Sequence, residues 1–237
     1  MRCAIVQPSY IPWRGYFDLI RRVDLFIFFD DVQYDRRGWR NRNRVKTPQG
    51  SRWLTIPVSA RGAQITGLPI NRVETVADDW PRKHFETLRR LYAKAPHFGQ
   101  YEYWLRRAYS AGAGRLLADF TIDLCQDIAG ALGISGVRFL RSSQLHAAGA
   151  KTERLRNLLV TVGATHYLSG PTARAYLDEA MLHQSGIDVE WMEYRYPEYP
   201  QLYPPFDPQV TALDLLFMTG PEAPRYLEVG REDTATP

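Results

Sequence analysis

The chain has 237 residues, of which 45% are hydrophobic, so it is long enough to bury a sizeable core in one large domain. No window of about 18 apolar residues is present, so we expect no helical membrane span. Residues 1–20 lack the pattern of a secretory signal peptide. The two cysteines, Cys3 and Cys125, have no metal-type spacing, and together these features favour a cytoplasmic protein.

The net charge of +4 is unevenly distributed along the chain. Residues 1–120 carry 21 Lys and Arg against 11 Asp and Glu, whereas the remaining residues carry 9 against 15. A basic half favours an anionic partner such as a nucleic acid, a nucleotide or phosphopantetheine. Charge alone does not choose among these partners.

The first elements in the chain are two short apolar strands. Residues 3–6 predict a strand, which a proline-rich turn connects to a helix around residues 15–23. The continuous apolar run at 24–29 is typical of a strand buried on both faces, and it ends abruptly in two aspartates. Residues 52–59 are a third candidate strand.

The middle of the chain, from about residue 78 to 133, has helical periodicity. In its last part, Leu116, Phe120, Leu124 and Ile128 recur at roughly helical spacing, which indicates a core-facing helix closed by a glycine at 133. Cys125 falls in this apolar pattern, so we interpret it as a core residue. We expect these helices to form an insertion packed on a sheet.

From residue 137 onward, strands and helices alternate. The predicted strands span 137–143, 165–170 and 187–194, and the predicted helices span 151–163, 171–186 and 208–220. Asp207 is a candidate cap of the last helix. This alternation predicts an α/β fold with a mostly parallel central sheet flanked by helices, a Rossmann-like layout. We expect one domain over residues 1–228 and a flexible tail over 229–237.

The unusual residues of this chain come directly after the predicted strands. Ligands of open parallel sheets bind beyond the carboxyl ends of the strands, near the point where the strand order reverses. The sequence therefore predicts one cleft there, and its candidate residues after the strands are Gln7, Tyr10, Trp13, Arg14, Tyr16, Asp30, Asp31, Ser143, Ser169, Gly170, Tyr199 and Gln201.

A run of basic residues over 36–46 is interleaved with Trp39, Asn41 and Asn43. Arginine suits bidentate phosphate contacts, so Trp39, Asn41 and Arg42 join the predicted cleft. The same combination of arginine and aromatic residues also fits an RNA-binding loop, and charge runs are often simply solvated.

His84 is the histidine best placed for chemistry. It lies just inside a predicted helix that begins at Asp79 and Pro81, where the helix start favours a neutral imidazole that can act as a base. A surface histidine without a role is an equal alternative. Lys151, at another helix start, either binds phosphate or is merely exposed. No zinc, P-loop or dinucleotide motif is present, so we expect no metal and no cofactor.

Several segments together resemble the WbqC-like family: QPSYIPWRGYFDLI, FFDDVQYDRRGWRNRNRVK, WPRKHFETL, YAKAPHF, THYLSGPTARAYLD and YPQLYPPFDPQVTALDLLFMTG. The resemblance covers about residues 3–228. It implies a place in bacterial biosynthesis of O-antigen, other surface polysaccharides or specialised metabolites. The activity that it implies is acyl or aminoacyl transfer to an amino group, for example on a nucleotide-linked amino sugar.

A looser likeness is to the nucleotidylyltransferase and pantothenate-synthetase type of fold. There a first strand leads into an HxGH turn whose histidines stabilise a reacting phosphate. Trp13, Arg14, Gly15 and Tyr16 stand in the corresponding stretch of this chain, so the glycine is kept and both histidines are replaced. This departure argues against adenylylating chemistry, although Arg14 can substitute in part.

The prediction is thus an amide-forming transferase acting on an activated phosphate-bearing substrate, namely a nucleotide-sugar, CoA or a carrier-protein thioester. His84 is the candidate base, with Asp30 or Asp31 to orient it. Tyr10, Ser143 or a backbone N–H near Gly170 meets the developing oxyanion, while Arg42 and Lys151 anchor phosphates. The alternatives are a nucleotidylyltransferase or ATP-dependent ligase, and a non-enzymatic RNA-binding or assembly protein.

Overall fold

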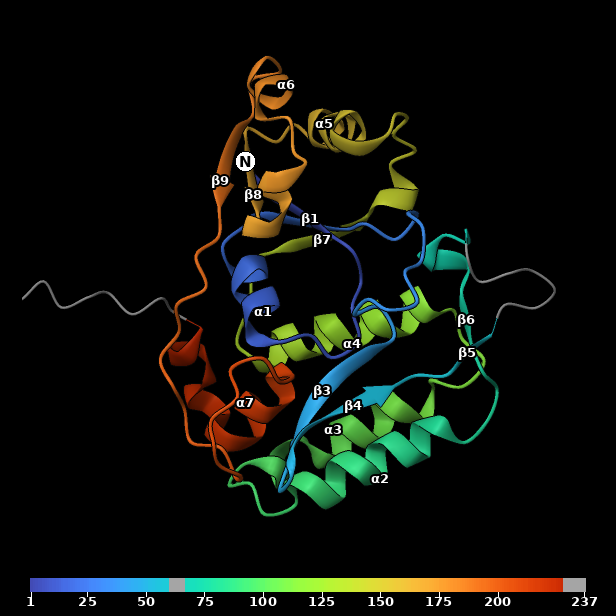
Figure 1. The fold of residues 1–237 in the computed structure, drawn as a ribbon, viewed down its shortest axis with the longest axis vertical. Coiled ribbons are helices and arrows are strands. Elements are labelled where there is room, and N and C mark those ends of the chain that lie inside the picture. Colours follow the sequence, from blue (N-terminus) through green and yellow to red (C-terminus); the bar gives the residue numbers. More distant parts are fainter. Residues whose placement is uncertain (60–66, 228–237) are drawn as a thin grey trace, which may run out of the picture.

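A central sheet of five parallel strands organises the molecule, and the computed structural model describes it within residues 1–59 and 67–227 (Figure 1). The strands lie in the order β7-β2-β1-β8-β9, and their bounds are β1 Arg2–Val6, β2 Leu25–Phe28, β7 Arg138–Arg141, β8 His166–Ser169 and β9 Asp188–Trp191. The predicted α/β class with a parallel central sheet is confirmed. The chain builds the sheet outward from β1 in both directions, so the strand order reverses between β1 and β8.

Alternate residues of the central strands face opposite sides of the sheet. Cys3 and Ile5 of β1 join a hydrophobic cluster with Leu155 and Leu182 of the helices α5 (Lys151–Thr161) and α6 (Glu179–His183). Ala4 of β1 instead joins the larger cluster on the other side, which includes α1 (Arg14–Arg21) and α4 (Leu117–Ala131). This period of two explains why an unbroken apolar run forms a strand buried on both faces.

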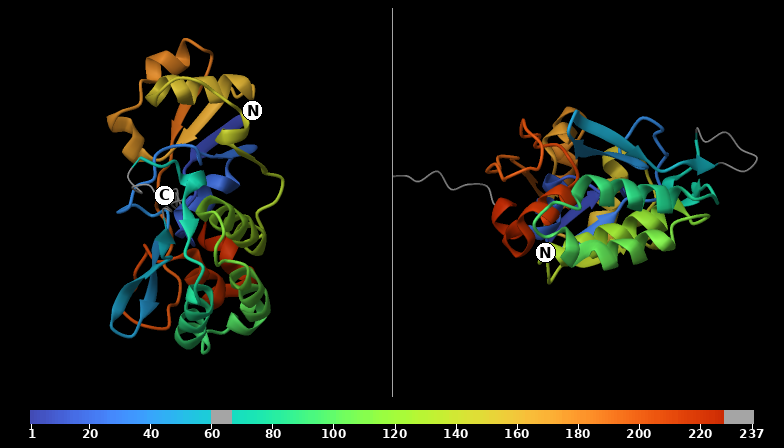
Figure 2. Two further views of the ribbon diagram at one scale, coloured as in Figure 1. Left: turned by 90° about the vertical axis from the view of Figure 1, so that its right-hand side faces the viewer. Right: turned by 90° about the horizontal axis from the view of Figure 1, so that it is seen from below.

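The helices predicted in the middle of the chain are present. They are α2 (Trp80–Tyr92) and α3 (Phe98–Ser110), which lie at the end of the molecule opposite α5 and α6, and α4, which lies between them and the sheet (Figure 1 and Figure 2). Cys125 is fully buried in α4, and Gly133 comes just after this helix with φ +72°, a conformation in which only glycine is unstrained. Division of the chain into one domain with an insertion stays a prediction.

The run of basic residues is a strand over part of its length, contrary to the predicted loop. β3 (Arg42–Thr47) pairs with β4 (Gly50–Thr55) in an antiparallel hairpin outside the parallel sheet. The candidate strand 52–59 is split, since β5 (Val58–Ser59) pairs with β6 (Glu74–Thr75) instead. Pro57 interrupts it, because proline has no N–H to donate to a ladder.

Two predictions about helices in the second half are wrong in detail. The helix expected over 171–186 is divided into a short 3₁₀ helix, Pro171–Ala175, and α6, whose cap Asp178 accepts a hydrogen bond from the Met181 N–H. The final helix α7 (Ala212–Thr219) is capped by Thr211 rather than by Asp207. The Asp207 carboxylate instead accepts from the Gln209 N–H, so it holds the turn before the helix.

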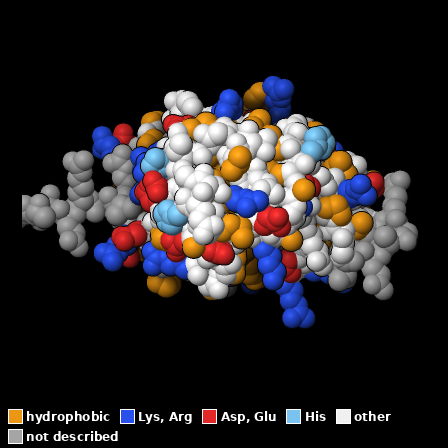
Figure 3. All heavy atoms as spheres, turned by 90° about the horizontal axis from the view of Figure 1, so that it is seen from above, with side chains coloured by type: hydrophobic (Ala, Val, Ile, Leu, Met, Phe, Trp, Pro, Cys, Tyr) orange, Lys and Arg blue, Asp and Glu red, His pale blue; other side chains and the backbone are white. Residues whose placement is uncertain are grey.

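The outer face over α5 and α6 carries acidic and basic side chains interspersed with scattered apolar ones (Figure 3). Within residues 1–59 and 67–227, none of the helices combines the length and the apolar character needed to cross a membrane. The predicted tail over 229–237 lies outside the described residues.

Candidate functional site

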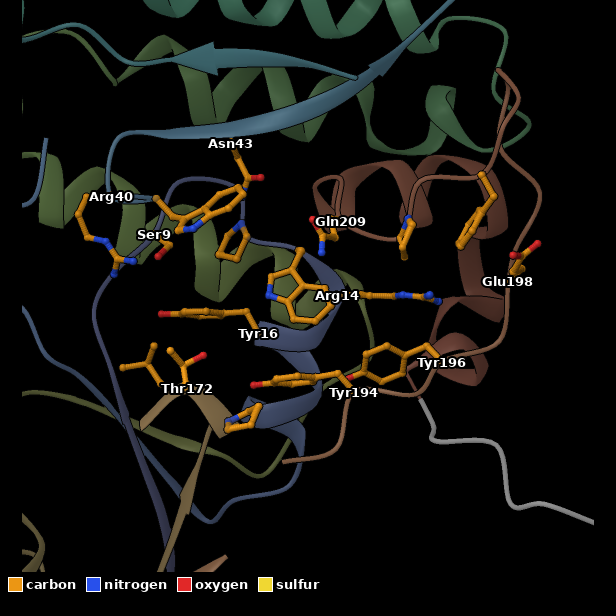
Figure 4. A pocket seen from close by; sticks show the side chains of 17 residues that line it. Ser9, Arg14, Tyr16, Arg40, Asn43, Thr172, Tyr194, Tyr196, Glu198 and Gln209 are labelled. Atoms are coloured by element: carbon orange, nitrogen blue, oxygen red, sulfur yellow. The ribbon is translucent and has the colours of Figure 1, made fainter. Parts of the chain in front are cut away.

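A cavity of about 850 Å³ opens at the carboxyl ends of β1 and β8, where the strand order reverses (Figure 4). This is the position at which open parallel sheets bind ligands. The cavity is lined by Val6, Ser9, Pro12, Trp13, Arg14, Tyr16, Trp39, Arg40, Asn43, Pro171, Thr172, Tyr194, Tyr196, Glu198, Phe206, Pro208 and Gln209. We call it the switch-point pocket.

The turn between β1 and α1 supplies the centre of this pocket. The indole of Trp13 folds back over Gly15, where an added Cβ would lie 2.3 Å from the ring. Glycine is therefore required at this position for the ring to lie there. The turn is held from the hairpin by Asn43, whose Nδ2 donates to the carbonyl oxygens of Tyr10 at 3.1 Å and Ile11 at 2.9 Å. Ile11 has φ +34°, a conformation that is strained for a β-branched residue and persists only when its surroundings impose it.

Arg14, the first residue of α1, is the buried cation of the pocket. Its side chain is 3% exposed, and Nη1 donates to the carbonyl oxygen of Pro197 at 2.7 Å. Its Nε has no hydrogen-bond partner among the described residues, and no carboxylate in that part of the chain pairs with the guanidinium. Burial lowers the pKa of Arg14, but an arginine stays protonated under ordinary conditions. The pocket therefore contains a positive charge without a carboxylate at ion-pair distance, beside the positive end of a helix, and Glu198 acts on it only from further away.

Aromatic rings wall the pocket on the side of the last strand. The ring of Tyr194 lies 4.9 Å from that of Trp13, and the Arg14 guanidinium lies 4.8 Å from the ring of Tyr196. The hydroxyl of Tyr196 donates to Asp18 Oδ2 at 2.9 Å, which fixes this segment onto α1. Burial raises the pKa of Tyr194 to about 12, so its hydroxyl is neutral and can donate a hydrogen bond at physiological pH.

The polar rim of the pocket contains both charge signs. Arg40 reaches in from the segment before β3, and its Nη1 donates to the carbonyl oxygen of Pro8 at 3.3 Å. Glu198 is exposed and faces the pocket from the segment after β9 (Figure 4). Ser9 and Thr172 add hydroxyl groups. These groups can hold a polar ligand whose anionic part lies against Arg14.

Four of the residues predicted from the sequence line this pocket: Trp13, Arg14, Tyr16 and Trp39. Three others lie just behind it. The carbonyl oxygen of Gln7 accepts from the Tyr16 hydroxyl at 3.1 Å, and a Cβ at Gly170 would lie 3.2 Å from the Tyr194 hydroxyl oxygen. The Ser169 hydroxyl donates to Tyr167 at 3.4 Å. These neighbours support the walls rather than line the pocket.

His84 is part of a buried aromatic cluster and does not line the switch-point pocket. Its Nδ1 is 2.9 Å from the hydroxyl oxygen of Tyr10, which is also hydrogen-bonded to the hydroxyl of Tyr109. The imidazole is 7% exposed and lies 5.1 Å from the ring of Trp80. Burial, rather than the helix start invoked from the sequence, lowers its pKa to about 4, so the ring is neutral. Its catalytic role stays a prediction.

The two aspartates after β2 lie at the other end of the sheet edge, beside β7. Asp30 is fully buried, and its carboxylate accepts from the Ser143 N–H at 3.0 Å and the Ser143 hydroxyl at 2.9 Å, while the Ser142 hydroxyl oxygen lies 3.2 Å away. Asp31 accepts from Ser142 at 2.6 Å and forms an ion pair with Arg154. Neither carboxylate contacts His84. Lys151, the first residue of α5, is exposed at this end with φ +51°.

The remaining predicted residues are bonded within the protein. Tyr199 donates to Asp214 Oδ2 at 2.8 Å and Gln201 donates to the same atom at 2.9 Å, so both hold the segment before α7. Asn41 is buried and its Nδ2 donates to the Ile56 carbonyl oxygen at 2.8 Å. Arg42 lies 4.4 Å from the ring of Trp53 on the outer face of the hairpin.

Tyr194, Tyr196 and Thr172 are pocket residues that the sequence reasoning missed. Thr172 comes three residues after the end of β8, and the two tyrosines come after β9 at alternating positions. Their signal was therefore the same one that identified Trp13 and Arg14, namely a place directly after a strand of the parallel sheet. Among the described residues, no group of three or more His, Cys, Asp or Glu side chains is arranged to hold a metal ion.

Comparison with known proteins places the chain in a family. The model of the WbqC-like protein family matches residues 7–226. A protein of Mycobacterium tuberculosis (strain ATCC 25618 / H37Rv), named as the uncharacterized protein Rv1507c, is 44% identical over 234 residues, which cover 98% of this chain and 99% of that protein. No solved structure matches this chain significantly. Because the family match covers nearly the whole chain, the protein belongs to the WbqC-like protein family.

Proposed function

We propose that this protein is a transferase that binds an activated, phosphate-bearing substrate in the switch-point pocket and passes an acyl or aminoacyl group to an amine. The observation that carries the proposal is Arg14, a buried cation without a carboxylate partner in the described part of the chain. A buried charge without a partner is costly, so a site of this kind is expected to take an anion. The pocket lies where the strand order of the sheet reverses, and this position also supports ligand binding there.

The size and walls of the pocket fit a nucleotide-like substrate. Its volume of about 850 Å³ lies within the range of pockets that enclose small organic ligands. Tyr16, Tyr194 and Trp13 offer flat surfaces against which a base or sugar packs, while Arg14 meets the phosphates. A nucleotide-linked amino sugar has all of these parts, which agrees with a role in the biosynthesis of surface polysaccharides or specialised metabolites.

Amide formation in this pocket needs a base for the amine. The nitrogen attacks the acyl carbon, the bond from that carbon to its carrier oxygen or sulfur breaks, and the proton of the amine leaves with a base. Glu198 is the carboxylate that lines the pocket, and we assign it the task of holding and deprotonating the ammonium group. His84 lies outside the lining, so it is the second candidate for the base.

The test is a calorimetric titration with a nucleoside diphosphate, a nucleotide-linked amino sugar, CoA and inorganic phosphate. We expect Arg14→Met to weaken binding of the preferred phosphate-bearing ligand about 10- to 100-fold, because a charge-assisted hydrogen bond is lost. Arg225→Ala is the matched control, since its side chain is 80% exposed and lies outside the pocket. Unchanged affinity in a folded Arg14→Met protein contradicts the proposal.

A second candidate function, nucleotidyl transfer or ATP-dependent ligation, is favoured by the strand order, which is that of a Rossmann-like fold. Pyrophosphate release from ATP in the presence of an acceptor distinguishes it from simple acyl transfer. With Trp13 and Tyr16 at the two positions that histidines occupy in such enzymes, we expect no pyrophosphate release.

A further inference from the structure

Two tryptophans stand side by side on the surface next to the switch-point pocket. Trp39 lies before β3 and Trp53 lies on β4, and their ring centroids are 5.0 Å apart. They are 42% and 47% exposed, which is unusual for the largest apolar side chains. The Arg42 guanidinium covers the ring of Trp53 at 4.4 Å. We call Trp39, Trp53 and Arg42 the tryptophan platform.

The segment that builds this platform has an extreme charge. Residues 36–53 contain six arginines and one lysine but no aspartate or glutamate. Arg44 and Lys46 are used within the protein, since Arg44 lies 3.7 Å from the Asp207 carboxylate and Lys46 is buried against the Pro205 carbonyl oxygen.

Two further arginines that precede the platform in sequence have no such partners. Arg36 and Arg37 are exposed and form no ion pair within residues 1–59 and 67–227, whereas Arg52 pairs with Val45 on the opposite face of the hairpin from Trp53. A hollow of about 430 Å³ is lined by residues 33–37, and Asp35 is the only acidic residue in it. The platform therefore combines open aromatic surfaces with uncompensated positive charge, unlike the face over α5 and α6, where the signs are mixed (Figure 3).

We propose that the tryptophan platform binds a single-stranded RNA segment. Exposed tryptophans stack on nucleobases, and arginines beside them pair with the phosphates between those bases, which is the arrangement that proteins use for single strands. A double helix does not offer its bases for stacking in this way. An acidic protein satisfies the arginines as well, but it leaves the exposed parts of the two indole rings without a matching flat partner.

The platform is continuous with the pocket, because Trp39 belongs to both. A strand that stacks on Trp39 and Trp53 therefore ends or passes at the pocket mouth. RNA binding itself does not depend on the proposed function.

The test measures fluorescence anisotropy of a labelled ten-nucleotide oligouridylate with the intact protein at 50 mM and 200 mM salt. We expect Trp53→Ala to weaken binding about 5- to 100-fold, because stacking of one base is lost. Trp53→Phe should restore most of the affinity. Arg36→Ala combined with Arg37→Ala should reduce the salt dependence, because fewer phosphate contacts form. Tyr103→Ala, which removes a 72% exposed aromatic ring on α3, should change nothing.

The outcomes separate the proposals. Three outcomes overturn the platform proposal. Wild type and folded Trp53→Ala bind the oligouridylate with equal affinity, or the wild type binds a duplex of the same length as tightly as the single strand. The third is that the protein captures an acidic carrier protein and does not bind RNA. Trp53 does not line the pocket, so Trp53→Ala should bind the small phosphate-bearing ligand as the wild type does. Conversely, Arg14→Met weakens small-ligand binding about 10- to 100-fold if the pocket proposal holds, whatever happens at the platform.

Discussion

The two ends of the sheet's carboxyl edge carry similar residues in different states. Beside β2 and β7, the Asp30 carboxylate is fully buried and accepts two hydrogen bonds from the N–H and the hydroxyl of Ser143. Beside β1 and β8, Arg14 is almost as deeply buried, yet no carboxylate in the described part of the chain forms an ion pair with it, whereas Arg154 at the other end pairs with Asp31. Asp30 and Arg14 therefore both follow the carboxyl end of a strand, but only the end that contains Asp30 supplies a carboxylate to its arginine.

This difference indicates which of the two polar clusters can bind a ligand. A buried group whose hydrogen bonds are all made within the protein has no free donor or acceptor for a ligand. The Asp30 carboxylate therefore stabilises the contact between the ends of β2 and β7. A buried group with unused hydrogen-bonding capacity needs something that the protein does not supply. The unpaired guanidinium, rather than the number of polar residues, marks the switch-point pocket as the site.

Removing the Asp30 carboxylate should have the largest effect on the free energy of unfolding. We expect Asp30→Ala to lower the free energy of unfolding by about 3 kcal/mol, because the N–H and the hydroxyl of Ser143 lose a charged acceptor. Urea denaturation measures this loss, with Asp127→Ala as a control because Asp127 is an exposed residue of α4. A folded Asp30→Ala protein that keeps its stability but loses ligand affinity would reverse the roles of the two ends.

His84 provides a pH-dependent test of the buried cluster beneath the opening turn. Its pKa is lowered from 6.5 to about 4, so its stabilising contribution is complete above pH 6.5 and is lost as the pH falls toward 4. Between pH 7 and pH 4, we expect the wild type to lose about 3 kcal/mol more than His84→Gln loses, since each pKa unit corresponds to about 1.4 kcal/mol.

Urea denaturation at a series of pH values measures this difference. His183→Gln is the control, because the His183 side chain is 53% exposed. Parallel pH profiles for wild type and His84→Gln would show that His84 is accessible to protons, as a catalytic base must be, and would bring it back as the leading candidate for that role.

Much of the fold was predictable because its signals are local. The apolar run at 24–29 contains β2, whose residues are all buried, and alternation of strands with helices indicated the parallel sheet. The hairpin was harder, because the alternating arginines of β3 look like a solvated loop. In the structure, Asn43 and Val45 of this strand are buried, whereas the alternate residues Arg42 and Arg44 are only partly buried.

The site was predictable only where it is continuous in sequence. Trp13, Arg14 and Tyr16 come soon after β1 and line the pocket. The bond that occupies Asp30 joins it to Ser143, 113 residues away, and no local pattern reports such a pairing. His84 did have a local signal, because it lies one helical turn before the fully buried Leu88 on α2 and so belongs to its apolar face.

The aromatic wall of the pocket should give a smaller, purely functional effect. We expect Tyr194→Leu to weaken binding of the preferred phosphate-bearing ligand about tenfold with little change in stability, because a flat packing surface beside Trp13 is lost. Calorimetric titration measures the affinity, and Tyr103→Leu serves as the exposed control. An effect on stability as large as that of Asp30→Ala would mean that this wall is structural, like the opposite end of the sheet.

Asp31 should show the smallest effect, although it neighbours Asp30 in sequence. Its carboxylate is 19% exposed and pairs with Arg154, which is 22% exposed, so solvent weakens the attraction. We expect Asp31→Asn to cost about 1 kcal/mol in urea denaturation, and this cost should shrink between 0.05 and 1 M salt because ions screen the pair. The amide oxygen of the new asparagine can still accept from the Ser142 hydroxyl, so the contact between the ends of β2 and β7 is kept. A salt-independent loss matching that of Asp30→Ala would show that both aspartates, rather than the buried one alone, hold β2 against β7.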